Sequence, residues 1–332
     1  MASLLPPVIA NYAGKPRCVG VEVEFAGVPP QDVLAAITSL YGGEIEEAHM
    51  FEYRVTGTSL GSFKLELDSS QLQALGEALS RSEREPINET IEAFGLPLLS
   101  KAAEAFVPWE VVTDPIEINN LTKLLPLISS MQQAGALGTR HAVHFAFGLH
   151  LNPDVPDLSA ETILQYLRAY FCLYDWIKAK EDINWTRTLS PYIRHFKNDY
   201  IRHILAPSYK PTIELLIDDY LAFNPTRNRS LDMLPLFAFI DENRVRNKVS
   251  DDRIKPRPTF HYRLPNCDID NPNWNIDYPW SLWLQVEKLA CNTLMLNQLC
   301  EKYSVNLDRL TASIDGQWLE TLNAFMKSGE NT

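Results

Sequence analysis

The stretch C-V-G-V-E-V-E-F at residues 18–25 decides how the rest of this chain is interpreted. Successive side chains of a β-strand point to opposite faces, so Glu22 and Glu24 share one face while the Val and Phe side chains share the other. The apolar side predicts a face packed on a core. Two carboxylates side by side on the opposite face indicate that water or a cation neutralises their charge.

The same alternation recurs in four later segments. The segments S-F-K-L-E-L-D at 62–68 and P-W-E-V-V-T-D at 108–114 each turn acidic side chains to one face. Two further segments, H-F-A-F-G-L-H-L-N at 144–152 and F-H-Y-R-L-P at 260–265, turn histidines and an arginine the same way. We therefore expect five strands to share one functional face. Its later side chains are Lys64, Glu66, Asp68, Glu110, Asp114, His144, His150, Asn152, His261 and Arg263.

The remaining segments predict an α+β fold. Residues 31–41 have the apolar spacing of a helix that ends at Gly42 and Gly43 and should cover the apolar face of the sheet. Residues 44–55 are expected to form a strand, which a loop at 57–61 turns back into the next strand. Strands and helices do not alternate regularly, which favours a largely antiparallel sheet. Helices are expected at 71–106, 118–134, 158–223, 280–303 and 307–326.

The length of 332 residues leaves one elaborated domain in competition with two. We expect a single catalytic domain over residues 1–332 with a core at about 17–265. Within it, a helical insertion would occupy about 158–223 and C-terminal helices about 278–327.

Charge and composition narrow the class of partner. The formal net charge of −12 is spread along the chain, which argues against a nucleic-acid-binding surface but allows a cation-bound nucleotide. The five cysteines are widely spaced, without a C-x-x-C pair, as in reduced cytoplasmic proteins. The first residues lack a basic flank and a long apolar core, and no later run reaches membrane-spanning length. We expect a cytoplasmic protein with no membrane or nucleic-acid partner.

Converging carboxylates predict a divalent-cation site. Two carboxylates about 4 Å apart repel each other by about 4 kcal/mol at an effective dielectric near 20, which a cation or protonation would relieve. Oxygen ligands with one histidine suit Mg²⁺ or Mn²⁺ better than Zn²⁺. Because Mg²⁺ held by carboxylates keeps coordination sites open for phosphate oxygens, ATP is the expected ligand. Neither a P-loop nor the Rossmann glycine motif occurs, so the phosphate contacts are expected from Lys64, Arg227, Arg229 and Arg263.

Simpler interpretations compete with each element. A single acidic strand face is more often solvated than metal-binding, and a lone histidine such as His150 is more often a hydrogen-bonded core residue. The basic residues at 241–258 are more often a solvated connection. Repetition of acids on three strands, followed by His150 and Asn152 on a fourth, favours the metal site.

These motifs, taken in order, resemble the amidoligase family, a branch of the carboxylate-amine ligases similar to glutamine synthetase and glutamate-cysteine ligase. The resemblance covers most of the chain between about 17 and 265. It rests on V-G-V-E-V-E-F-A-G, L-E-L-D, W-E-V-V-T-D-P, G-A-L-G-T, F-G-L-H-L-N, N-R-S-L-D-M-L-P and F-H-Y-R-L-P.

The resemblance implies a curved antiparallel sheet of the glutamine-synthetase type, backed by helices and lined with metal-binding acids. It implies an ATP-dependent carbon–nitrogen ligase that activates a carboxylate as an acyl phosphate, which an amine then attacks. The acid and amine would be small molecules or peptides, with a protein terminus as a further candidate. On this resemblance Glu24, Glu66 and Arg263 are catalytic, and Arg263 contacts phosphate. The implied metal ligands are Glu22, Glu24, Glu66, Glu110, His150 and His261.

One position departs from the related ligases, which usually have a glutamate two residues before the arginine, where this chain has His261. Imidazole binds Mn²⁺ more readily than Mg²⁺, so either the metal preference has shifted or one metal is lost. A catalytically impaired ATP-binding or scaffolding protein is therefore an alternative. A metal-dependent hydrolase that uses water as nucleophile is a third hypothesis.

Overall fold

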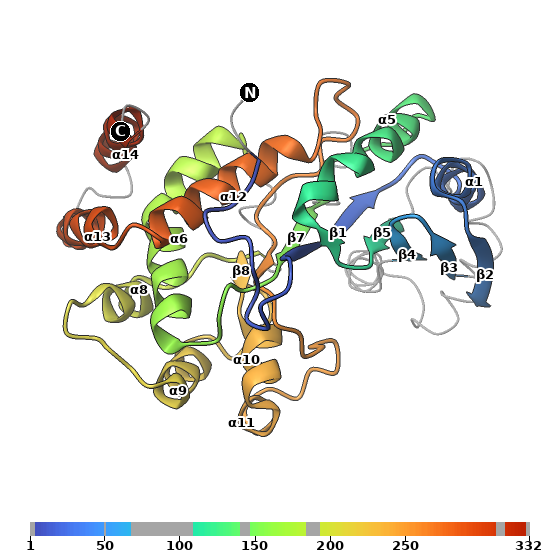
Figure 1. Ribbon diagram of the computed structural model, residues 1–332. Helices are drawn as coiled ribbons and strands as arrows, with labels where there is room; N and C mark the ends of the chain where they lie inside the picture. The colour runs from blue at the N-terminus through green and yellow to red at the C-terminus, as the bar shows by residue number, and fades with distance from the viewer. Residues whose placement is uncertain are drawn as a thin grey trace, which may run out of the picture. The chain divides into compact units, whose positions relative to one another are not determined.

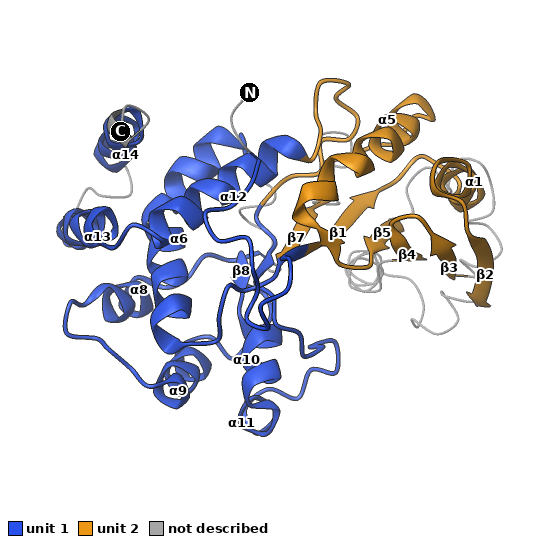
Figure 2. Cartoon of the chain, in the orientation of Figure 1, with its two compact units in different colours: residues 1–18, 153–264, 277–332 blue, residues 19–152, 265–276 orange. Residues whose placement is uncertain are grey.

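The computed structural model describes residues 4–49, 51–67, 109–139, 147–183, 193–309 and 316–329. The chain forms two compact units, each built from separate segments (Figure 2). We call residues 19–152 and 265–276 the sheet unit, and residues 1–18, 153–264 and 277–332 the helical unit. The predicted helix at 71–106, together with Asp68 and His144, lies outside the described residues.

The sheet unit is organised around β1 (Cys18–Phe25). Its strands follow the order β2-β3-β4-β5-β1-β7, and β6 also pairs with β1. The pairs β2–β3, β3–β4, β4–β5 and β5–β1 are antiparallel. The other strands are β2 (Glu44–His49), β3 (Glu52–Thr58), β4 (Gly61–Leu67), β5 (Trp109–Thr113), β6 (Ile116–Glu117) and β7 (Leu149–Pro153). The prediction of an α+β fold with a largely antiparallel sheet is confirmed.

Alternation along these strands produces one apolar face. Val21 and Val23 of β1 and Leu65 of β4 are buried. The helix α1 (Pro30–Tyr41) packs on β3 and β4 and on α5 (Leu125–Gln133), as Figure 1 shows. Proline suits the first turn of α1 because that backbone position needs no hydrogen-bond donor. The helix covers the apolar face, as predicted.

Two predicted elements of the sheet unit differ from the structure. The single strand expected at 44–55 is two paired strands, β2 and β3. The helix expected at 118–134 begins as the 3₁₀-helix η1 (Ile118–Leu124) and becomes α5, which has Pro126 in its first turn. Proline fits the first turn of an α-helix but disrupts a helix that precedes it, because it has no backbone N–H to donate. Pro126 therefore separates η1 from α5.

The helical unit is arranged around α6 (Ala160–Lys180). Ser159 caps this helix by accepting a hydrogen bond from the Thr162 backbone N–H. Most of the apolar side chains of α6 are buried. The helix packs against α8, α9, α12, α13 and α14 (Figure 1). The other elements are α8 (Asn198–Leu205), α9 (Ile213–Phe223), β8 (Leu231–Asp232), α10 (Leu234–Ile240), α11 (Glu242–Arg246), β9 (His261–Tyr262), α12 (Asp277–Ala290), α13 (Thr293–Leu307) and α14 (Gln317–Gly329).

The end of the chain contains three helices where two were predicted. The expected helix at 280–303 is interrupted between α12 and α13, because Asn292 leaves helical geometry and its side chain accepts a hydrogen bond from the Met295 backbone. An asparagine in this position caps a new helix.

A fully buried ion pair joins the first residues of the helical unit to α12. The Arg17 guanidinium makes two hydrogen bonds of 2.7 Å to the Glu287 carboxylate, and both side chains are completely inaccessible. Tyr166 and Trp283 donate to the same carboxylate at 2.8 Å. Burial acts to lower the pKa of Arg17, but the hydrogen bonds and charge of Glu287 outweigh it and raise that pKa.

The five cysteines all lie in the described residues and none forms a disulfide, and the sulfur atoms of Cys172 and Cys300 lie 3.8 Å apart. In the described part of the chain, no helix has both the length and the apolar character needed to cross a membrane.

Candidate metal centre

A row of glutamates crosses the polar face of the sheet unit. In the antiparallel register Glu24 lies opposite Glu110, Glu110 opposite Glu66, and Glu66 opposite Glu52. Directly opposed residues of antiparallel strands point to the same face, so four carboxylates follow one another across four strands. Like charges in this arrangement destabilise a sheet, which indicates that the row is kept for a function.

From Glu66 to Glu24 the row becomes more buried. The side chain of Glu66 is 28% exposed, whereas that of Glu24 is 8% exposed. Charges repel more strongly where less water screens them, so a bound cation would relieve the most repulsion at β1. The candidate site therefore lies at the β1 end of the row.

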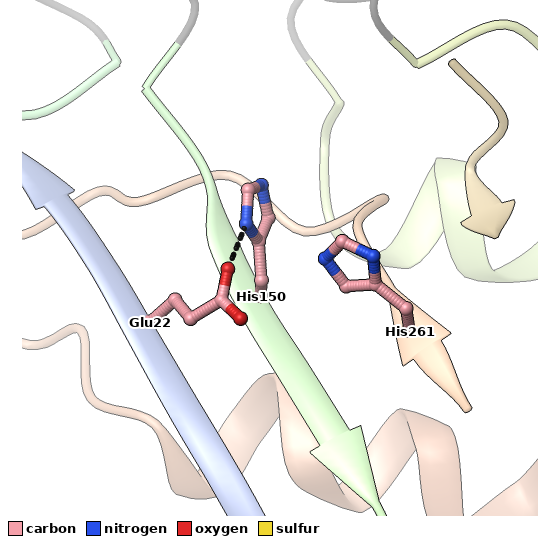
Figure 3. Close-up of side chains that lie close together, drawn as sticks. All are labelled: Glu22, His150 and His261. Atoms are coloured by element: carbon pink, nitrogen blue, oxygen red, sulfur yellow. Dashed lines mark hydrogen bonds and ion pairs between the residues drawn. The ribbon is translucent and has the colours of Figure 1, made fainter. Parts of the chain in front are cut away.

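His150 lies among three carboxylates, those of Glu24 and Glu110 in the row and that of Glu22 on β1. Its Nδ1 atom is 2.8 Å from Glu22 Oε2 and 3.9 Å from Glu110 Oε1, and its Nε2 atom is 3.4 Å from Glu24 Oε1. Figure 3 shows the Glu22–His150 hydrogen bond joining β1 to β7. Three carboxylates thus share one imidazole, which at most carries a single positive charge.

The backbone of the sheet fixes the position of Glu24. Its backbone N–H donates to the Gly148 carbonyl at 3.1 Å, while the Gly148 N–H donates to its Oε2 atom at 2.6 Å. A hydrogen bond from a backbone amide favours the ionised carboxylate. Glu24 is therefore held in place by the strand pair with its other oxygen directed to His150.

Glu24, Glu110 and His150 meet the geometric requirement for a metal site. One ligand atom from each lies within 4.8 Å of the others. Two carboxylates with one imidazole form a donor set that suits Mn²⁺ or Mg²⁺, because hard divalent cations prefer oxygen ligands and Mn²⁺ also accepts nitrogen. These three residues fit a divalent cation.

The predicted residues of β4 occupy the same face but form their own contact. Lys64 and Glu66 are joined by a close ion pair, and both side chains are partly exposed. The register places Lys64 opposite Arg54 on β3, in a row parallel to the glutamates. The structure thus places Glu66 opposite Glu110 and pairs it with Lys64, and a phosphate contact by Lys64 stays a prediction.

The predicted residues on β8 and β9 belong to the helical unit. His261, which Figure 3 also draws, lies opposite Asp232, and its Nδ1 atom is 3.5 Å from Asp232 Oδ2. Arg263 donates to the Arg227 carbonyl at 2.9 Å. Burial and the charge of Arg263 lower the pKa of Arg227, while the charges of Asp232 and Asp251 act to raise it. A phosphate contact by Arg227 or Arg263 stays a prediction.

Arg229 has a different environment. It donates to the His195 carbonyl at 3.0 Å, and its guanidinium lies 5.6 Å from the centre of the Phe196 ring. The whole residue is 7% exposed. Burial lowers the pKa of Arg229. Burial of His195, together with the charge of Arg229, lowers the pKa of His195 to about 3. Within the helical unit Arg229 contributes to an aromatic core, and a phosphate contact by this residue stays a prediction.

Sequence reasoning assigned no role to three residues of these surroundings. Asn152 was placed on the correct face, and its amide donates to Glu22 Oε1 at 2.8 Å. Glu52 extends the glutamate row, which alternation across β3 would have revealed had the turn near residue 50 been recognised. Asp232 pairs with His261 through the β8–β9 register, for which the sequence carries no local signal.

The fold and this site define an α+β protein whose antiparallel sheet carries a candidate metal site of two carboxylates and one histidine. Residues 15–285 match the model of a family described as "Putative amidoligase enzyme". The match spans most of the chain, and the chain therefore belongs to the amidoligase family. No curated protein and no solved structure matches it.

Proposed function

We propose that this protein is an ATP-dependent carboxylate–amine ligase that forms an amide or peptide bond. The observation that carries the proposal is the group of Glu24, Glu110 and His150 within 4.8 Å, in a chain that belongs to the amidoligase family. A Mg²⁺ or Mn²⁺ ion bound there would neutralise phosphate oxygens of ATP during phosphoryl transfer. The chemistry requires two steps, each with different demands on the protein.

In the first step the substrate carboxylate attacks the γ-phosphorus of ATP, which forms an acyl phosphate and releases ADP. Negative charge spreads over the transferred group, and fixed cations stabilise it. Lys64 on β4 is the group of the sheet unit that we assign to this charge. Phosphate contacts by Arg227 and Arg263, which belong to the helical unit, stay predictions. In the second step the amine attacks the acyl carbon, inorganic phosphate leaves, and the amide remains.

The substrates we propose are a small-molecule or peptide carboxylate and an amine. Glu66, tied to Lys64, is the residue we assign to binding the incoming ammonium group or removing its proton, because a carboxylate accepts hydrogen bonds only. Glu22 contributes to the metal centre through its hydrogen bond with His150. That His261 binds the metal stays a prediction. A protein terminus as substrate belongs to the same proposal.

The test is an assay of purified protein with ATP, Mg²⁺ or Mn²⁺, and pooled acids and amines, in which phosphate release and amide formation are followed together. Stoichiometric ADP, phosphate and amide would support the ligase. Metal-dependent hydrolysis of pooled amides or esters in the absence of ATP would instead identify a metal-dependent hydrolase. Neither turnover nor nucleotide binding with any pool would contradict the proposal.

His261 supports a second candidate, an ATP-binding protein of the same fold with impaired catalysis. Its imidazole stands where the related ligases have a glutamate, and it lies beside the buried Asp232 carboxylate. Titration calorimetry with ATP and Mn²⁺ separates the candidates. Binding of both ligands without turnover, in a protein whose His261→Glu variant gains turnover, would favour the impaired protein.

A further inference from the structure

Glu22 is held from two sides within the sheet unit. Its Oε1 atom accepts a hydrogen bond from Asn152 Nδ2, and its Oε2 atom lies at hydrogen-bond distance from His150 Nδ1, both at 2.8 Å. Asn152 and His150 are two residues apart on β7, so their side chains point to the same face. The Glu22 carboxylate of β1 is thus hydrogen-bonded to two side chains on the same face of β7, those of His150 and Asn152.

These hydrogen bonds determine the tautomer of His150. An ionised carboxylate accepts hydrogen bonds and donates none, so the hydrogen between Glu22 and His150 belongs to Nδ1. In the neutral ring the lone pair then lies on Nε2, the atom that is 3.4 Å from Glu24 Oε1. The Asn152 amide fixes the Glu22 carboxylate and, through it, the plane of the imidazole.

We infer that Asn152 and Glu22 are positioning residues that act through His150, so that the first ligands of the cation are His150 Nε2 and Glu24. These roles rest on the proposed function of the site, which they deepen. Histidines that bind metals commonly donate their other ring N–H to a carboxylate, which sets ring orientation and raises ligand basicity. Glu22 takes that place here, and Asn152 supports it.

The packing around Asn152 agrees with a fixed side chain. Asn152 is 5% exposed, and it faces Gly20 of β1. A methyl group built on Gly20 would meet the Asn152 Cβ at 3.5 Å, an ordinary contact. Gly20→Ala therefore changes the surroundings of Asn152 without removing a hydrogen bond, and it provides a matched control.

The first test is made without metal. In protein labelled with ¹⁵N in its histidines, at a pH where the ring is neutral, His150 is expected as the Nδ1–H tautomer in the wild type and in Gly20→Ala. Asn152→Ala and Glu22→Gln are expected to lose this preference. An Nε2–H tautomer in the wild type, or no change in either variant, would overturn the inference whatever the protein's activity.

The second test measures Mn²⁺ affinity by electron paramagnetic resonance. Loss of partners of this kind weakens metal binding by about 10- to 100-fold, and we expect that loss for Asn152→Ala and for Glu22→Gln. If Asn152 acts through Glu22, the double variant binds no more weakly than Glu22→Gln. Additive losses would show that Asn152 acts on the cation independently and would contradict the inference.

The two tests separate failure of this inference from failure of the proposed function. A wild type with the Nδ1–H tautomer but no Mn²⁺ binding would remove the metal centre, and with it both the proposed ligase and the assignment of ligands. Tight Mn²⁺ binding with turnover, combined with additive losses, would keep the ligase and remove only the positioning role. Circular dichroism of each variant confirms that the fold is intact.

Discussion

The two units of the molecule bury carboxylates in opposite ways. In the helical unit Glu287 receives hydrogen bonds from Arg17, Tyr166 and Trp283, so charge and lone pairs are matched. In the sheet unit Glu22, Glu24 and Glu110 share one imidazole. A charge that is matched by fixed partners serves the fold, whereas a concentration of like charge in a partly buried place favours uptake of a cation.

The largest expected effect is on stability in the helical unit. Glu287→Gln leaves the Arg17 guanidinium buried beside a neutral partner, and we expect the free energy of unfolding to fall by about 3–5 kcal/mol in urea titrations. Arg202→Gln, which breaks the exposed pair with Asp308, is the control and should cost about 1 kcal/mol or less. Equal effects of the two variants would show that burial does not distinguish these pairs.

The second prediction concerns activity in the sheet unit. Glu24→Gln removes a ligand charge at constant volume, and we expect turnover in the ligase assay to fall by about 100-fold or more, equivalent to about 2.7 kcal/mol. The metal-free variant should be at least as stable as the wild type because repulsion with Glu110 is removed. Glu44→Gln, an exposed glutamate of β2, is the matched control. Unchanged turnover in Glu24→Gln would refute its role.

The third prediction contrasts the response of the two units to metal. Mn²⁺ at about 100 times its Kd should raise the free energy of unfolding by about 2.7 kcal/mol, because it binds the folded state alone. His150→Gln should abolish that gain, whereas Arg202→Gln should retain it. Thermal melts with and without Mn²⁺ give the measurement, and equal metal responses in both variants would place the cation elsewhere.

The smallest expected effect, counted per pH unit, is a pH dependence in the helical unit. Burial, with the charge of Arg229, lowers the pKa of His195 from its usual 6.5 to about 3. The unfolded state therefore binds more protons between these values, and His195 lowers stability as pH falls from about 6.5 toward 3, by at most about 1.4 kcal/mol per pH unit. His195→Phe, which keeps a ring stacked on Tyr174, should flatten this part of the stability profile. A profile identical to that of the wild type would show that His195 is not the group responsible.

Sequence reasoning succeeded where the signal was local. The alternation of residues 18–25 predicted the acidic face, and the same period located Glu66, Glu110 and His150 on it. It failed at element boundaries, because the turn that divides β2 from β3 and the cap at Asn292 are decided by a few side chains. The functions of Arg227, Arg229 and Arg263 stay predictions.

The order of apolar and acidic residues was enough by itself to determine the strand faces, the α+β class and the kind of ion the acids would suit, since side-chain period is a local property of the backbone. Tertiary structure alone decided which carboxylates meet, through the register that sets Glu24 opposite Glu110 and the pairing of β1 with β7 that brings His150 to Glu22. Register depends on contacts between segments more than a hundred residues apart, such as Glu22 and Asn152, and no local pattern encodes it.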